Sequence, residues 1–374
     1  MKIRAAVLEV TAAPAPYAQS QPLRVREVEL TPPGFGEVLV RIGAAGLCHS
    51  DLSVINGDRP RPLPMVLGHE SSGTVVECGA GVTDLGVGDH VVLVFVPSCG
   101  CCVPCAEGRP ALCEPGAASN AAGTLLSGER RLRLAGQAVN HHVGVSCFAE
   151  HAVVSRRSCV KIESDLSHAE AALFGCAVLT GVGAVVNTAR VQAGSRVAVL
   201  GLGGVGLNAL MAAVASGARD VIALDLNDTK LELARSLGAT AAVNAVSPDA
   251  LEQVRALTSG GVDYAFEMAG SVKAMELAWR ITRRGGHTIS AGLPHPDHRF
   301  ALPLTQMVAE ERSIRGSYIG SSVPLRDIPR YIDLYRRGKL PVDRLMGERL
   351  ALDDINRGFD RLASGGALRD VIVF

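Results

Sequence analysis

A glycine-rich turn between a short apolar strand and a helix constrains this chain more than any other feature. The sequence GLGGVG at 201–206 follows a predicted strand at 196–200 and opens an apolar helix that runs to about residue 216. The first glycine allows a tight turn, the second lets a pyrophosphate approach the backbone, and the third lets helix and strand pack closely. The helix N-terminus then offers unpaired N–H groups and a positive dipole to phosphates. The turn therefore predicts a dinucleotide site, with candidate contacts at Gly201, Gly203, Gly204, Val205 and Gly206.

An acidic residue follows at the position where such a site binds the adenosine ribose. Asp225 closes the next predicted strand, 220–225, and lies 19 residues beyond Gly206. Leu226 and Asn227 come directly after it, so no Arg is present there to hold a 2′-phosphate. This pattern favours NAD over NADP, and Lys230 is a further candidate for cofactor binding. The alternative is a structural glycine-rich turn followed by a surface Asp.

Strands and helices alternate through the second half of the chain. Six strands are predicted, with helical stretches between most of them, at 196–200, 220–225, 241–244, 262–267, 286–291 and 313–318. This alternation is typical of a doubly wound parallel sheet, here of six strands, in which Asn227 or Asp228 caps the second helix.

The first half of the chain has a different texture. Short strands with dense Gly and Pro between them, predicted at 37–42, 74–78, 90–94 and 148–154, are typical of an all-β barrel-like unit. After about residue 320 a helical run and a last strand at 369–374 leave the βα rhythm, and we expect them to return to the first domain. At about 100–200 residues per domain, the 374 residues fit an α/β chain with domains 1–178 and 179–319 and a return at 320–374.

Composition excludes several classes of protein. With 37 basic and 37 acidic residues the formal charge is zero, and aromatic residues are 4% of the chain, so nothing favours nucleic acid or an anionic membrane surface. The uncharged runs at 171–189 and 197–218 are long enough to span a bilayer, but their glycines favour buried segments. The N-terminus lacks the pattern of a secretory signal. We expect a soluble, cytoplasmic protein without membrane or nucleic-acid partners.

Five of the ten cysteines lie in one short loop, 97–115, and four of them have a regular spacing. Cys99, Cys102, Cys105 and Cys113 are spaced by 3, 3 and 8 residues, with Pro and Gly between them. In a reducing compartment this spacing indicates metal before disulfides, and four converging thiolates fit a closed, structural zinc site. Cys101 is an additional thiol in the loop that could compete as a ligand. Free buried cysteines are the alternative.

A second group is dispersed along the chain and is unremarkable by spacing alone. It comprises Cys48 in GLCHSD, His69 and Glu70 in LGHE, and Cys176 in FGC. Three further cysteines have no such context and are interpreted as core or surface thiols: Cys78, Cys147 and Cys159.

Together these motifs resemble the zinc-dependent medium-chain alcohol dehydrogenases, and the resemblance covers essentially the whole chain. It is carried by GLCHSD at 46–51, GHE at 68–70, the cysteine loop, GC at 175–176, GLGGVG at 201–206 and Asp225. The length between Cys113 and Cys176 resembles the long form of the family, which is typical of its dimeric members. The resemblance implies a GroES-like β-barrel catalytic domain, a Rossmann cofactor domain, two zinc ions per chain, NAD, and a homodimer or a tetramer.

The resemblance also implies roles for individual residues. A catalytic zinc would be held by Cys48, His69 and Cys176, which leave one open position, with Glu70 beside them as an alternating ligand. Asp51 would accept a hydrogen bond from His69 and fix its tautomer. Ser50 would take the proton of a zinc-bound alcohol, whose pKa zinc lowers. On the NAD side we expect Thr180 near the nicotinamide and His49 and Arg369 near the pyrophosphate.

One position departs from the family pattern. Well-known members continue the proton relay through a His five residues after the first ligand cysteine, and here that position is Ser53. A serine passes a proton through water but does not store one near neutral pH. We therefore expect activity that follows bulk base rather than a His-buffered relay.

The expected substrate pocket contains Phe95 as an aromatic wall, His142 and Val143 where relatives carry bulkier apolar residues, and Arg59 in a closing loop. These residues predict a wider, more polar pocket that takes a primary or aromatic alcohol or its aldehyde. The acidic pair that glutathione-linked formaldehyde dehydrogenases carry in this loop is absent in that form, which disfavours their substrate. The alternatives are a polyol or secondary-alcohol dehydrogenase of the same superfamily, and a non-catalytic NAD-binding redox sensor.

Overall fold

The computed structural model describes residues 1–374 and divides into two compact units. Unit 1 comprises Met1–Cys176, Val323–Pro329 and Asp343–Phe374, and unit 2 comprises Ala177–Ser322 and Arg330–Val342. The predicted return at 320–374 is therefore interrupted, because Arg330–Val342 groups with unit 2. Helix α12 (Pro324–Arg336) crosses that boundary. The limits of the functional domains stay predictions.

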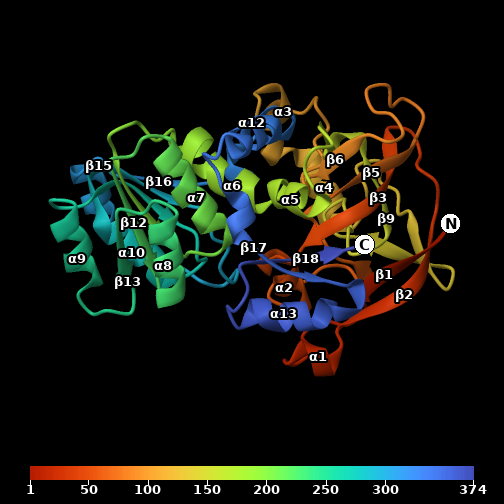
Figure 1. The fold of residues 1–374 in the computed structure, drawn as a ribbon, viewed down its shortest axis with the longest axis horizontal. Coiled ribbons are helices and arrows are strands. Elements are labelled where there is room, and N and C mark those ends of the chain that lie inside the picture. The colour runs from red at the N-terminus through yellow and green to blue at the C-terminus, as the bar shows by residue number, and fades with distance from the viewer. The chain divides into compact units, whose positions relative to one another are not determined.

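Unit 1 is built on a closed barrel and a mainly antiparallel sheet (Figure 1). The barrel has the order β1 (Lys2–Leu8), β2 (Leu23–Leu30), β7 (Leu132–Leu134), β8 (Gln137–His141) and β4 (Met65–Val66). The sheet has the order β10 (Cys159–Ile162), β6 (His90–Leu93), β5 (Ser71–Cys78), β3 (Glu37–Gly46), β18 (Arg369–Val373) and β17 (Met346–Leu350), and β9 (His151–Ser155) also pairs with β3. The barrel-like unit predicted from the strand and turn pattern is confirmed.

Six helices belong to unit 1: α1 (Tyr17–Ser20), α2 (His49–Ile55), α3 (Val103–Ala106), α4 (Glu114–Ala122), α5 (His168–Ala172) and α13 (Ile355–Ala363). The late helix α13 contacts the early helices α1 and α2, which Figure 1 shows as blue beside red. A buried core that includes Phe148 and Phe359, whose rings meet edge to face at 6.0 Å, joins these distant parts of the chain.

Unit 2 contains a six-stranded, entirely parallel sheet. Its order is β13 (Ala241–Asn244), β12 (Asp220–Asp225), β11 (Arg196–Leu200), β14 (Val262–Glu267), β15 (Thr282–Ser290) and β16 (Ser313–Gly316). The order reverses at β11, which is the arrangement of a Rossmann fold. The helices of this unit are α6 (Ala177–Gly183), α7 (Gly204–Ala215), α8 (Asp228–Ser236), α9 (Ala250–Leu257), α10 (Val272–Ile281) and α11 (Leu304–Ala309). The doubly wound sheet of six strands is confirmed.

Several predicted bounds needed correction. Strand β9 begins at His151 rather than at 148, and β15 begins at Thr282 rather than at 286. The early residues of β15 escaped detection because they are polar and glycine-rich and lack an apolar alternation. Asn227, not Asp228, caps α8, since its side chain accepts the N–H of Thr229 at 2.9 Å.

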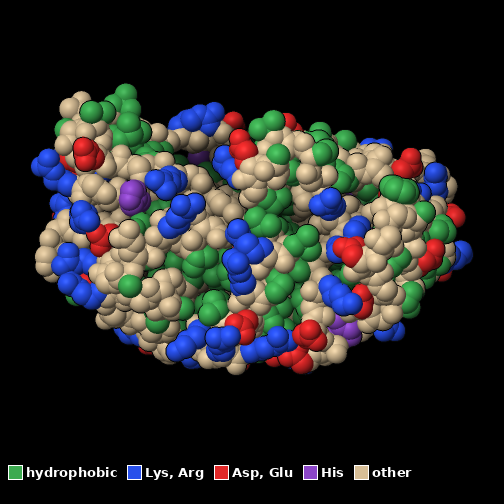
Figure 2. Space-filling view, turned by 90° about the horizontal axis from the view of Figure 1, so that it is seen from above, with side chains coloured by type: hydrophobic (Ala, Val, Ile, Leu, Met, Phe, Trp, Pro, Cys, Tyr) green, Lys and Arg blue, Asp and Glu red, His purple; other side chains and the backbone are tan.

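No single helix is long and apolar enough to cross a bilayer. The two bent segments His168–Gly175 and Ala177–Ala189 would together be long and apolar enough, by length and composition alone. Both uncharged runs that the sequence singled out are largely buried. On the face shown in Figure 2, basic and acidic side chains both occur and no one sign covers the surface.

The barrel holds a buried histidine whose ionisation is coupled to stability. His141 ends β8, and its Nε2 accepts the N–H of Arg131 at 3.0 Å. Burial, reinforced by Arg130 and Arg131, lowers the pKa of His141 from 6.5 to about 3. Below about pH 6.5 the unfolded chain therefore binds a proton that the folded chain refuses, and stability falls as the pH falls toward 3.

We expect His141→Gln to weaken this acid sensitivity, because the amide oxygen still accepts the Arg131 N–H but has no proton to gain. Between about pH 6.5 and about pH 5, the parent should lose about 2 kcal/mol more free energy of unfolding than the variant. Urea unfolding at the two pH values measures this. His298→Gln, at an exposed histidine, is the control and should behave as the parent; equal losses in all three proteins would contradict the assignment.

Candidate functional site

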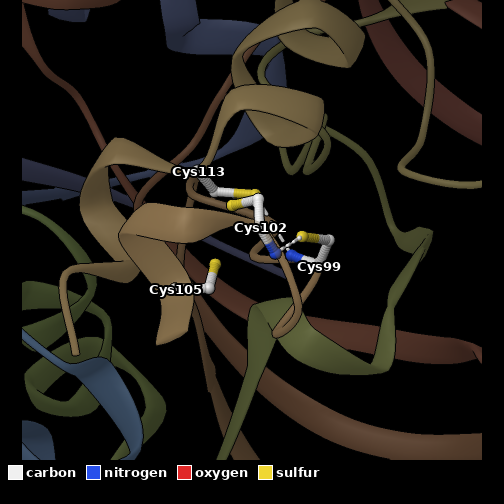
Figure 3. Close-up of side chains that lie close together, drawn as sticks. All are labelled: Cys99, Cys102, Cys105 and Cys113. Carbon is white, nitrogen blue, oxygen red and sulfur yellow. Dashed lines mark hydrogen bonds between the residues drawn. The ribbon is translucent and has the colours of Figure 1, made fainter. Parts of the chain in front are cut away.

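The four loop cysteines that the sequence singled out lie together (Figure 3). The sulfur atoms of Cys99, Cys102, Cys105 and Cys113 all lie within 4.8 Å of one another. Backbone N–H groups point at two of these sulfurs: Cys102 donates to Cys99 at 3.3 Å, and Cys99 donates to Cys113 at 3.1 Å. Such hydrogen bonds favour thiolates, and those from Cys101 and Cys102 lower the pKa of Cys99 to about 6. The group fits a tetrahedral zinc ion.

Cys101 lies outside this group of four. Its side chain is exposed, and its thiol donates to the Cys99 sulfur at 3.7 Å. The backbone N–H of Cys101 points at the same sulfur at 3.4 Å. Residue 101 therefore contributes hydrogen bonds to the Cys99 sulfur, while its own thiol stays at the surface.

The dispersed residues also come together, in the interior of unit 1. The ligand atoms of Cys48, His69, Glu70 and Cys176 lie within 4.8 Å of one another, and all four side chains are buried. Cys48 is the N-cap of α2 and follows the end of β3 after one intervening residue, Leu47. The pair His69–Glu70 directly precedes β5, and Cys176 directly precedes α6. Three separate strand or helix ends thus supply one centre.

The polar atoms at this centre fit a cation. His69 Nε2 and both carboxylate oxygens of Glu70 are buried without a hydrogen-bond partner, and such atoms are costly unless an ion satisfies them. Burial raises the pKa of Glu70 to about 7. A hydrogen bond from Cys176, with Arg369 and His69 nearby, holds the pKa of Cys48 well below its ordinary value. Two sulfurs and an imidazole nitrogen are ligands that zinc prefers.

A buried carboxylate orients the histidine of this centre. Asp51, in the first turn of α2, is fully buried, and its Oδ1 lies 3.1 Å from His69 Nδ1. The same oxygen accepts the N–H of Gly68 at 3.0 Å. Gly68 has φ +92, a conformation that other residues rarely adopt, which accounts for the glycine of the LGHE motif. With Nδ1 held by Asp51, Nε2 of His69 is left for a metal.

Arg369, the first residue of β18, belongs to the same centre. Its guanidinium forms an ion pair with Glu70 at 3.3 Å and donates to the carbonyl of Leu47 at 3.1 Å, and the side chain is 5% exposed. The sequence indicated only a contact to the pyrophosphate. The ion pair was missed because no local pattern links residues so far apart in the chain.

Two predicted pocket residues pack on His69. The rings of Phe95 and His142 lie 5.0 and 5.6 Å from the His69 ring, each at 83° to it. His142 Nδ1 also lies 3.1 Å from Asp51 Oδ1, a contact that the sequence did not reveal. Val143 is buried beside it with φ +45.

The remaining predicted residues of this region are placed as follows. Ser50 and His49 lie in the first turn of α2, with Ser50 partly buried and His49 exposed. The Ser53 hydroxyl donates to the His49 carbonyl at 2.9 Å, within its own helix. Arg59 is partly buried in the loop after α2, where its N–H bonds the Ser53 carbonyl at 2.8 Å.

In unit 2 the glycine-rich turn has close backbone contacts. A Cβ at position 206 would lie 1.8 Å from the carbonyl oxygen of Gly201, whereas one at 203 would meet nothing within 4 Å. Asp225 ends β12, and its carboxylate accepts the N–H of Leu202 at 2.6 Å, which ties that strand end to the turn. The other predicted residues lie on helices: Thr180 on α6, Gly204 and Val205 at the start of α7, and Lys230 on α8.

A barrel-containing unit with two thiolate-rich metal centres, followed by a Rossmann unit, defines a zinc-binding dehydrogenase. The family model described as "Alcohol dehydrogenase GroES-like domain" matches residues 34–164, and the one described as "Zinc-binding dehydrogenase" matches residues 204–337. The chain is 37% identical to the S-(hydroxymethyl)glutathione dehydrogenase of Synechocystis sp., with all of both chains covered.

Solved structures agree. The zinc-binding alcohol dehydrogenase domain protein of Burkholderia ambifaria is 34% identical with a TM-score of 0.94, and the benzyl alcohol dehydrogenase of Acinetobacter calcoaceticus is 33% identical with a TM-score of 0.93. Each alignment covers 100% of this chain and 99% of the other. The chain belongs to the zinc-dependent medium-chain alcohol dehydrogenases.

The surroundings of two glycines in the turn predict different roles, packing for Gly206 and cofactor binding for Gly203. Gly206→Ala should force the turn open and lower the free energy of unfolding by about 1–3 kcal/mol. Gly203→Ala should keep the parental stability, because position 203 has open space and φ −76, yet weaken NADH binding, since a methyl group there blocks the pyrophosphate. Thermal unfolding and NADH fluorescence titration measure the two effects. Parental stability in Gly206→Ala would refute this interpretation.

Proposed function

We propose that this protein is an NAD-dependent alcohol dehydrogenase that interconverts a primary or aromatic alcohol and its aldehyde. The observation that carries the proposal is the buried group Cys48, His69, Glu70 and Cys176, in which His69 Nε2 has no hydrogen-bond partner. A catalytic zinc site needs three protein ligands and one open position. Cys48, His69 and Cys176 are proposed as those ligands, with Glu70, held by Arg369, as the alternating one.

The reaction needs an acidified hydroxyl and a hydride acceptor. When bound, zinc would supply Lewis acidity to a coordinated hydroxyl and a nicotinamide would accept the hydride. The sulfurs of Cys48 and Cys176, as thiolates, would offset the +2 charge of the ion. Asp51 holds His69 in the required tautomer, Ser50 receives the hydroxyl proton, and Phe95, Val143 and Arg59 line the substrate side. The Ser53 hydroxyl donates to a carbonyl of its own helix and, unlike an imidazole, does not titrate near neutral pH, so it supports no histidine-like proton store.

The cofactor is proposed to be NAD. Residues 201–206 of the turn bind its pyrophosphate, together with His49 and Arg369. Asp225 receives the ribose hydroxyls, and Lys230 and Thr180 flank the adenosine and nicotinamide ends. The residues after Asp225 are Leu226 and Asn227, which offer no cation to a 2′-phosphate.

For the substrate, two relatives support different candidates. The Acinetobacter neighbour is named a benzyl alcohol dehydrogenase, which supports an aromatic alcohol. The curated relatives named S-(hydroxymethyl)glutathione dehydrogenase support that thiol adduct as a second candidate, although its acidic pair is absent from the loop around Arg59 in the usual form. We further propose that residues 1–178 and 320–374 form the catalytic domain and that residues 179–319 form the NAD domain. The protein is proposed to be a homodimer located in the cytoplasm.

Loss of one proposed zinc ligand should remove the ion from one proposed metal centre and leave the ion at the other. We expect Cys176→Ala to retain one zinc per chain instead of two and to lose essentially all turnover, while it still binds NADH. Metal analysis, steady-state rates and NADH fluorescence measure the three properties. Cys159→Ala, at a buried thiol outside both groups, is the matched control and should keep both ions. Turnover that survives Cys176→Ala would exclude the assignment.

A substrate and cofactor panel tests the specificity. Benzyl alcohol, S-(hydroxymethyl)glutathione, an aliphatic primary alcohol and a polyol are each assayed with NAD and with NADP, followed by the absorbance of the reduced nicotinamide. We expect the highest kcat/KM with benzyl alcohol and NAD. A preference for the glutathione adduct would select the second candidate, and a preference for the polyol or for NADP would contradict the proposal.

A further inference from the structure

The buried carboxylate of Asp51 has two histidine neighbours, not one. Its Oδ1 lies 3.1 Å from His69 Nδ1 and 3.1 Å from His142 Nδ1, and it also accepts the N–H of Gly68 at 3.0 Å. Asp51 and His142 are 0% and 3% exposed, so neither group exchanges this neighbour for bulk water. A buried carboxylate needs such partners. His142 Nδ1 lies within ion-pair distance of it and has no hydrogen-bond partner of its own, so Asp51 is the polar group that it faces.

Hydrogen bonds of Ser146 and Val145 hold the turn that contains His142. The Ser146 hydroxyl accepts the N–H of His142 at 2.8 Å and donates to the carbonyl of Val66 at 2.8 Å. The N–H of Val145 also bonds the His142 carbonyl at 3.0 Å. These bonds hold Val143 at φ +45, which is strained for a β-branched residue. Strain of this kind persists only where the surrounding contacts determine the conformation, so His142 is held rigidly against Asp51.

We propose that His142 is a positioning residue for the catalytic zinc, acting through Asp51 on His69. The inference rests on the zinc ligands proposed above. In this proposal the His142 Nδ1–H, 3.1 Å from Asp51 Oδ1, keeps the carboxylate aligned with His69 Nδ1, and the lone pair of His69 Nε2 stays directed at the metal. Groups that orient a metal ligand in this way contribute about 10–100-fold to metal affinity. His142 therefore has a role in metal retention in addition to lining the substrate side.

The chain offers a matched comparison for this role. Phe95 packs on His69 at 5.0 Å and the same 83° angle as His142, but its ring has no N–H to offer a carboxylate. Loss of the Phe95 ring therefore tests packing against His69 alone. His142→Phe keeps a ring and removes the donor, whereas His142→Asn keeps an N–H near the Nδ1 position in a smaller side chain.

The experiment measures zinc retention in the full-length, zinc-loaded protein. Each variant is titrated with a zinc chelator, and zinc content is followed together with thermal unfolding. We expect catalytic-site affinity to fall about tenfold or more in His142→Phe, to recover to within a few-fold of the parent in His142→Asn, and to stay parental in Phe95→Leu. The zinc at the four loop cysteines should remain in every variant. His142→Leu provides a second donor-free variant if His142→Phe does not fold.

Three results would overturn the proposal. Parental zinc affinity in both donor-free variants shows that His142 does not position the site. Equal losses in Phe95→Leu and His142→Phe, or no recovery in His142→Asn, show that ring packing rather than the N–H matters. A third zinc per chain in the parent shows that Asp51, His69 and His142 hold an ion of their own. A parent with only one zinc contradicts the proposed function itself, before His142 is tested.

Discussion

The structure of unit 1 depends on the pairing of charges that it buries. Asp51 and Glu70 are fully buried, and two cysteine thiols lie beside them. Ionised groups in an apolar interior are tolerated only when paired. Arg369 pairs with Glu70 on one side, and the proposed zinc ion would satisfy the sulfurs and the imidazole nitrogen on the other. The end of β3, the start of α2, the residues just before β5 and the start of β18 must therefore all meet at one point.

Much of this arrangement was readable in the sequence because its signals are local. The strands β11, β12 and β14 have the predicted bounds, since each is a short apolar run between turn residues. The glycine-rich turn and the loop cysteines were equally clear, because their spacing alone restricts what they can do. The dispersed residues Cys48, His69 and Cys176 became recognisable as candidate ligands only through the resemblance to a family, because their spacing carries no such information.

The contacts that the sequence did not reveal are those between remote segments. The ion pair of Arg369 with Glu70 joins the start of the last strand to the approach to β5. The contact of His142 with Asp51 depends on a turn in which Val143 adopts a conformation that its residue type disfavours. Local propensity opposes that turn, and hydrogen bonds of Ser146 and of the Val145 N–H stabilise it. Similarly, Arg330–Val342 groups with unit 2 through tertiary contacts, and hydrophobic periodicity in the sequence does not predict such contacts.

The position of β18 in the chain bears on how the protein matures. This strand pairs with β3, which is made early, yet it follows the whole of unit 2 in the sequence. In a nascent chain Glu70 is therefore translated long before Arg369. The buried carboxylate therefore gains its counter-charge only after the whole of unit 2 has been synthesised, so this ion pair closes unit 1 late in translation.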